Sequence, residues 1–249
     1  MAGVFDISVL KREFSGKNSF NRKDLLSFFK KSDPDINKGT FGWRIYHLKQ
    51  QGLLRAIGRG VYSLSNKVLF HPPDEKELEK IHKQITANYP YLKVCMWNTR
   101  WMNDFMVHQS GRFLIIIEVE KDAAESVFYY LRDKGYNNAF LQPDENVMRQ
   151  YVYQYPETLI VQRLLTKSPL QQLNKMIVPK LEKILVDIFC EQFIFSGFTG
   201  ELKNIFNTAF EKYDINFSTL LTYAWRRGKK KEIIEFMKAN TTIPGNILK

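Results

Sequence analysis

The sequence has few cysteines, few histidines and no long apolar run. Only two of its 249 residues are cysteines, Cys95 and Cys190, and four are histidines. Both cysteines lie among apolar residues, so we expect buried thiols rather than a disulfide. Neither cysteine has a partner at zinc-ligand spacing, and the histidines are scattered along the chain. We therefore expect no bound metal and no cofactor.

The chain also lacks the marks of membrane and secreted proteins. A membrane-spanning helix needs ~18 continuous apolar residues, and the densest apolar run, FLIIIEV, is interrupted by Glu118. The N-terminal stretch MAGVFDISVLKREF has no charged region followed by an apolar segment, so no signal peptide is expected. Together with the low cysteine content, this favours a reducing cytoplasm. A Gly-rich phosphate loop, a nucleophile elbow and catalytic-triad spacing are also missing.

Basic charge is concentrated at the two ends of the chain, whose net charge is +11. Residues 1–70 hold 13 Lys and Arg against 5 Asp and Glu, whereas residues 71–221 hold 17 against 19. Residues 222–249 hold 7 against 2. This asymmetry indicates a polyanion or an acidic partner, with a solvated basic face as the alternative.

The N-terminal region predicts three helices followed by a hairpin. Apolar residues at helical spacing begin the chain, and Asn21 is a typical N-cap for a second helix, RKDLLSFFKK. A third helix is predicted over residues 38–51, with Gly52 after its end. The stretch LLRAIGRGVYSL, residues 53–64, has two apolar arms around a glycine turn. This order of elements is typical of a winged helix-turn-helix.

The rest of the chain predicts a sheet and then helices. Pro72 and Pro73 indicate a linker. Beyond them, EKELEKIHKQI and DAAESVFYYLRDKG read as helices, while YLKVCMWNT, GRFLIIIEVE, VMRQYVYQ and TLIVQRLL read as strands. From Pro179 onward the pattern is helical. The predicted fold is α+β: a winged helix-turn-helix over residues 1–70, a small α/β sheet domain over 71–178, and a helical part over 179–249 packed on the second domain.

The third helix and the hairpin carry the candidate DNA contacts. With Phe41, Ile45 and Leu48 turned inward, polar and aromatic side chains face outward. In a major groove, Arg suits guanine, Gln suits adenine, and Lys and Thr suit phosphate. A wing would carry an arginine at its tip, within reach of a phosphate or a minor groove. The candidate residues are Lys38, Thr40, Trp43, Arg44, His47, Gln50, Arg55 and Arg59.

Two further segments are candidate partner or second DNA surfaces. WNTRWMNDFMVHQ, residues 97–109, interleaves tryptophans, methionines and polar residues, and Trp and Met are favoured at interface centres. RRGKKK, residues 226–231, is a dense basic run, for which a solvated helix junction is the alternative. The candidate residues are Trp97, Trp101, Arg226, Arg227, Lys229 and Lys230.

A metal-dependent nuclease is a weaker alternative. Asp104, Glu118, Glu120 and Lys121 loosely match the acidic pair and lysine of restriction-type nucleases, which hold Mg²⁺ at a strand end. The usual spacing puts the lysine two residues after the second acid, and here Val119 occupies that acidic position. The simpler interpretation is a strand that ends in solvent-facing charges.

Two motifs resemble a known family. LKQQGLLRAIGRGVYSL resembles the winged-helix ending of the AbiEi-like transcriptional regulators, the antitoxins of type IV abortive-infection systems, and VPKLEKILVDIF resembles a helix of their second domain. The resemblance implies a DNA-binding domain that represses its own operon and a C-terminal domain for antitoxin action. It also implies a nucleotidyltransferase-like toxin as partner and no enzymatic activity. The DNA-contacting helix would map onto residues 38–51 and the wing onto residues 55–62.

These observations favour a sequence-specific, cytoplasmic DNA-binding regulator, the antitoxin of a two-gene system, with double-stranded operator DNA as its partner. The second hypothesis is a protein-interaction adaptor that uses the winged helix or the surface of residues 97–109. The metal-dependent nuclease is the third.

Overall fold

The chain forms two units, which are described separately. The computed structural model describes residues 7–17, 19–58, 60–64 and 67–241. Unit 1 comprises residues 1–69, 210–218 and 243–249, and unit 2 comprises residues 70–209 and 219–242. The break after residue 69 lies next to the predicted linker. The assignment of residues 210–218 to unit 1 was not predicted, because that segment reads as part of the helical C-terminal region. The fold class is mixed α+β, as predicted.

The described residues of unit 1 before residue 70 form three helices and a small antiparallel sheet in the strand order β1-β3-β2. The three predicted helices and the hairpin are present. The helices are α1 (Ile7–Phe14), α2 (Arg22–Ser32) and α3 (Lys38–Gln50). The strands are β1 (Phe20–Asn21), β2 (Leu54–Gly58) and β3 (Val61–Leu64).

Local sequence signals explain the boundaries of the unit 1 helices. The Asn21 side chain accepts hydrogen bonds from the N–H groups of Lys23 and Asp24, and Asp24 bonds back to the Asn21 N–H at 2.7 Å, forming a capping box for α2. Gly52 follows α3 with φ +67°, which glycine adopts without steric cost. The buried core is rich in aromatic rings, among them Phe14, Phe28 and Phe29.

Unit 2 is built on a six-stranded mixed sheet in the order β6-β7-β5-β4-β9-β8. The central pair β4 and β5 is antiparallel, and β5, β7 and β6 run parallel to one another. The strands are β4 (Cys95–Asn98), β5 (Phe113–Val119), β6 (Ala139–Leu141), β7 (Glu157–Arg163), β8 (Leu170–Leu173) and β9 (Met176–Pro179). β5 is buried along nearly its whole length, because helices cover both of its faces.

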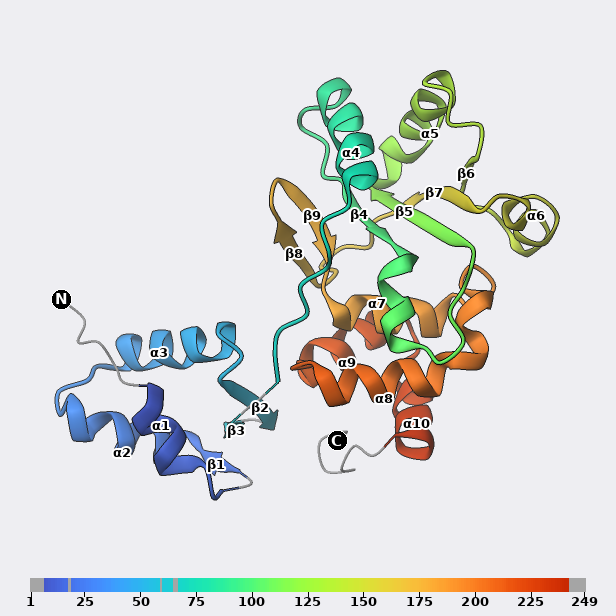
Figure 1. Cartoon of the computed structure of the whole chain (residues 1–249). Coiled ribbons are helices and arrows are strands. Elements are labelled where there is room, and N and C mark those ends of the chain that lie inside the picture. The colour runs from blue at the N-terminus through green and yellow to red at the C-terminus, as the bar shows by residue number, and fades with distance from the viewer. Residues whose placement is uncertain (1–6, 18, 59, 65–66, 242–249) are drawn as a thin grey trace. The chain divides into compact units, whose positions relative to one another are not determined.

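Alternation along the strands assigns side chains to the two faces of this sheet. The helices α4 (Lys76–Asn88) and α5 (Ala124–Asp133) cover one face, and α7 (Leu181–Cys190) lies across the other (Figure 1). Cys95 and Glu118 are cross-strand partners on the α7 side, whereas Asn98 faces the α4 side. The unit therefore has a central sheet with a charged residue, Glu118, in its interior.

The C-terminal region is helical as predicted, but its first helix begins after Pro179. Pro179 ends β9 and α7 begins at Leu181, because residues 170–179 form the unpredicted hairpin β8–β9. The remaining elements are η4 (Ser196–Glu201), α8 (Leu202–Lys212), α9 (Phe217–Arg226) and α10 (Lys230–Asn240). None of the helices in the described part of the chain combines the length and the hydropathy that a membrane crossing needs.

The expectation of a strand over VMRQYVYQ is wrong. This segment forms α6 (Glu145–Gln150) and a 3-10 turn, η3 (Val152–Gln154). Asp144 caps α6 by accepting a hydrogen bond from the Val147 N–H at 2.8 Å. A capping residue three positions before Val147 indicates the start of a helix. The alternating tyrosines of the segment favoured a strand instead, and the cap was overlooked.

Both cysteines are free thiols, Cys95 buried and Cys190 half-buried. Burial raises the pKa of the Cys95 thiol well above its usual range, and it raises that of Cys190 to about 11. At neutral pH both stay protonated and unreactive.

Candidate functional site

The outward side of α3 is an exposed aromatic surface of unit 1. Trp43 and Tyr46 have 55% and 58% of their surface exposed, and His47 is exposed beside them. The ring centroids of Trp43 and His47 lie 4.0 Å apart, and Tyr46 meets His47 edge-on at 6.0 Å. Residues three or four positions apart share one side of a helix. We call these three residues the α3 aromatic face.

The helix that presents this face is fixed at its start and along its inner side. The Asn37 side chain caps α3 by accepting a hydrogen bond from the Thr40 N–H at 2.8 Å. Phe41, Ile45 and Leu48 are buried, as the spacing predicted. The α3 aromatic face is therefore held by a packed helix rather than by a free loop.

The remaining candidate residues of α3 and of the hairpin differ in their exposure. Lys38 is the first residue of the helix and is exposed, whereas Thr40 is half-buried. The side chain of Gln50 and the whole of Arg59 lie outside the described residues. Tyr46 was missed by sequence reasoning, although its position three residues after Trp43 was a usable signal.

Arg44 does not belong to the outward face, which corrects its prediction as a base-reading side chain. Its guanidinium donates to the Asp33 carboxylate at 2.8 Å and lies 5.4 Å from the centroid of the Phe29 ring. Only 11% of the Arg44 side chain is exposed. Asp33 lies at the end of α2, so Arg44 fastens α3 to the preceding helix.

Arg55 of β2 is likewise engaged inside unit 1. Its Nε lies 3.7 Å from Asp214 Oδ1, and its guanidinium covers the Phe217 ring at 4.7 Å. Burial lowers the pKa of Arg55, and the Asp214 charge opposes that effect. The prediction left open whether Arg55 faces DNA or water. The structure gives a third answer, because residues 210–218 cover it.

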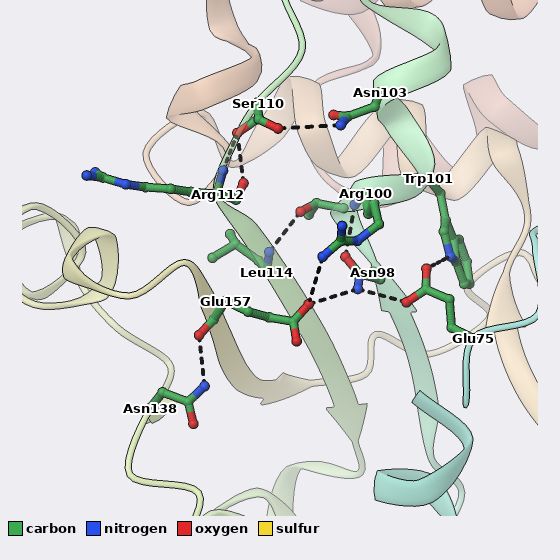
Figure 2. A network of polar contacts seen from close by, with 11 residues as sticks. Glu75, Asn98, Arg100, Trp101, Asn103, Ser110, Arg112, Leu114, Asn138 and Glu157 are labelled. Carbon is green, nitrogen blue, oxygen red and sulfur yellow. Dashed lines mark hydrogen bonds and ion pairs between the residues drawn. The ribbon is translucent and has the colours of Figure 1, made fainter. Parts of the chain in front are cut away.

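Trp97 and Trp101 are core residues, which corrects their prediction as a partner surface. Their exposed fractions are 1% and 4%. Trp97 packs on Phe195 at 5.7 Å between ring centroids, and the Trp101 Nε1–H donates to the Glu75 carboxylate at 2.5 Å. Figure 2 shows Glu75 between Trp101 and Asn98. Both tryptophans are buried because their rings are large and apolar. The Glu75 carboxylate accepts the hydrogen bond that the buried indole N–H of Trp101 requires.

At the second candidate surface, the junction of α9 and α10, only some of the predicted basic side chains are exposed. Arg226 and Lys229 are exposed and Lys230 is half-buried. Arg227 turns inward and donates to Glu191 at 2.5 Å. It therefore belongs to the interior of unit 2, contrary to its prediction as a surface contact.

A buried ionic cluster lies between β5 and α7. The Lys183 ammonium donates to both Glu118 carboxylate oxygens at 2.7 and 2.8 Å, and to Asp187 at 2.5 Å. The Tyr223 hydroxyl donates to Asp187 at 2.9 Å. Burial raises the pKa of Glu118, which Lys183 opposes. For Lys183 the penalty of burial is outweighed by Asp187 and Glu118, so its pKa is raised.

This cluster removes the geometric basis of the nuclease alternative at β5. Glu118 faces α7 and binds Lys183, whereas Asp104, Glu120 and Lys121 are exposed. Across the described residues, no three His, Cys, Asp or Glu side chains come together as a metal site would require. Glu118 is thus an internal ion-pair partner, and the simpler interpretation, a strand that ends in solvent-facing charges, is wrong for this residue.

The chain belongs to a protein family of unknown function, DUF6577, whose sequence model matches residues 40–243. The matched range begins within α3 and includes all of unit 2. No curated protein matches the chain at a significant level. The function therefore has to be inferred from the geometry.

Proposed function

We propose that this DUF6577 protein is a sequence-specific DNA-binding transcriptional regulator, with unit 1 as a winged helix-turn-helix domain. In this proposal α3 enters the major groove and the β2–β3 hairpin is the wing. The observation that carries it is the α3 aromatic face, because a packed third helix leaves Trp43, Tyr46 and His47 free for a partner. Apolar ring edges suit thymine methyl groups, and histidine can bond a base or a phosphate.

The charge of unit 1 supports the same proposal. Residues 1–70 carry a net charge of +8. Lys38 at the first position of α3 and Lys23 at the start of α2 are exposed. Both are placed to hold phosphates, next to helix N-termini that favour anions. Because Arg44 and Arg55 pair inside the unit, we assign phosphate binding to the lysines and base reading to the α3 aromatic face.

We further propose that the regulator is the autorepressing antitoxin of a cytoplasmic type IV toxin–antitoxin system. The motifs of the β2–β3 hairpin and of α7, which resemble those of AbiEi-like proteins, support this. Its partners would be the operator of its own operon and a nucleotidyltransferase-like toxin. A neighbouring gene that encodes such a toxin is the expected finding, and its absence would leave a stand-alone regulator.

The DNA-binding proposal is tested with matched tyrosine variants of the full chain. Tyr46 and Tyr129 are similarly exposed, at 58% and 56%, but Tyr129 lies on α5 of unit 2. Tyr46→Ala should weaken binding to the upstream DNA by about tenfold, the cost of ~1–3 kcal/mol for a base contact, while Tyr129→Ala should not. Fluorescence anisotropy with labelled DNA measures both. Absence of binding by the wild-type chain would refute the proposal.

A second candidate function is a protein-interaction adaptor. The α3 aromatic face favours it, since exposed Trp and Tyr are typical of the centres of protein interfaces, and Arg44 is not available to read guanine. In that case Tyr46→Ala should abolish co-purification with a protein partner, and the chain should not shift its upstream DNA.

A further inference from the structure

We infer that unit 2 holds a binding pocket for a small organic monoanion, a carboxylate attached to an apolar body. The pocket has a volume of about 540 Å³, which lies within the range of small-molecule sites. Ser110, Gly111 and Arg112 form one wall, just before β5. Ile194, between α7 and η4, and the first three residues of η4 form the other. This inference does not depend on the proposed function of unit 1.

Arg112 gives the pocket its charge. It is the one charged residue among those that line the cavity. None of the ion pairs in the described part of the chain involves Arg112, and Figure 2 shows its side chain extending away from the strand. Glu201, at the end of η4, is engaged elsewhere, since it accepts hydrogen bonds from the Val107 N–H at 2.9 Å and from Asn204 at 2.8 Å. A free guanidinium fork matches a carboxylate in a bidentate geometry.

The wall that carries Arg112 is ordered by its own hydrogen bonds. The Ser110 hydroxyl donates to the Arg112 carbonyl at 2.7 Å and accepts from the Arg112 N–H at 3.2 Å. The Asn103 amide donates to the Ser110 carbonyl at 3.4 Å, as Figure 2 also shows. A fixed backbone lowers the entropic cost of holding a ligand at Arg112.

The opposite wall supplies a second donor. The Tyr153 hydroxyl lies 3.0 Å from the Ile194 carbonyl and 2.5 Å from the Ser196 hydroxyl. When Tyr153 donates to Ser196 instead of to Ile194, the Ser196 hydrogen becomes free to point at a ligand oxygen. A carboxylate could therefore bind the Arg112 fork and the Ser196 hydroxyl together.

The apolar lining indicates what the anion is attached to. Leu114, Ile194 and Phe198 line the cavity with buried side chains. The pocket of about 540 Å³ has room for more than an inorganic ion, and these three side chains favour an apolar body attached to the carboxylate. A single arginine compensates one negative charge, which favours a monocarboxylate over a polyphosphate.

The inference is tested by calorimetric titration of the full chain with two probes, 3-phenylpropionate and octanoate. We expect one or both to bind at least tenfold more tightly than acetate and than the neutral alcohol 3-phenylpropanol, because acetate lacks the body and the alcohol lacks the charge. Binding of neither carboxylate, or equal binding of the alcohol, would overturn the inference. Tighter binding of inorganic phosphate than of either probe would overturn it as well.

Matched variants locate the site. Arg112→Gln should weaken binding by about tenfold or more, the value of a charge-assisted hydrogen bond. Arg163→Gln is the control, because Arg163 is exposed and pairs in register with Val119 at the far end of β5, whereas Arg112 precedes Phe113 at the near end. Gly197→Leu should fill the cavity and abolish binding while circular dichroism stays unchanged. Equal effects of the two arginine variants, or binding retained in both Arg112→Gln and Gly197→Leu, would refute the site.

Discussion

Three arginines of the two basic segments lie in ion pairs inside the protein. The exposed fractions of the Arg44, Arg55 and Arg227 side chains are 11%, 17% and 14%. Arg44 and Arg55 also cover an aromatic ring. A planar guanidinium can stack on a ring and bind a carboxylate at the same time, so arginine serves in interiors where lysine is rarely used. Counting basic residues therefore overestimates the charge that a polyanion would meet.

Lys183 is the exception, a fully buried lysine, and its removal should strongly destabilise unit 2. Lys183→Met leaves the Glu118 carboxylate buried without its cation, and Asp187 keeps only the more distant cation Arg227, at 3.4 Å. Breaking such a cluster from one side costs about 3–5 kcal/mol. Urea denaturation followed by the fluorescence of the buried Trp97 and Trp101 measures the loss.

Lys175→Met is the control for this prediction, because Lys175 is exposed. A change below about 0.5 kcal/mol is expected there, as for most surface substitutions. If Lys183→Met were as stable as Lys175→Met, the ionic cluster would contribute nothing that a well-packed apolar side chain could not replace.

At the scale of elements, the sequence predicted those parts whose signals are local. The three helices of unit 1, the hairpin, β4, β5 and β7 all follow from apolar spacing, caps and glycines. The inward turn of Arg44 could not be predicted, because it depends on Asp33 from another element. The burial of Trp97 and Trp101 depends on Phe195 and Glu75, which are distant in sequence. Sequence periodicity predicts which side of a helix or strand is apolar. It does not predict which polar side chain of a distant segment will pair with a residue on that element.

Arg44→Ala should loosen the attachment of α3 to α2 rather than change the DNA sequence that is preferred. It removes the ion pair with Asp33 and the contact with Phe29, for a loss of about 1–2 kcal/mol. Hydrogen exchange of the α3 amides measures it. Arg12→Ala on the exposed surface of α1 is the control and should leave the exchange unchanged. If Arg44→Ala changed the preferred operator sequence but not the hydrogen exchange of α3, Arg44 would be a base-reading residue, as the sequence predicted.

At the scale of the whole molecule, each unit carries a different part of the inferred function. Unit 1 holds the α3 aromatic face and the basic segment of residues 1–69, whereas the pocket with Arg112 and the ionic cluster both lie in unit 2. In the function we propose, the regulator would bind DNA with unit 1 and a ligand or a partner with unit 2. Unit 1 has a net charge of +8 and unit 2 one of +3, so unit 2 is the poorer polyanion binder.

This division predicts where the salt dependence of DNA binding arises. Each phosphate contact that is lost should reduce the slope of log K against log salt by about 0.9. Lys38→Gln in unit 1 should show that reduction, whereas Lys80→Gln, which also removes an exposed charge but from α4 of unit 2, should leave the slope unchanged. Anisotropy titrations at several salt concentrations give the slopes. Equal reductions in both variants would mean that net charge alone attracts the DNA, without contacts at the start of α3. If the slope were unchanged in Lys38→Gln, Lys38 would not contact a phosphate, and the α3 aromatic face would have no phosphate contact beside it.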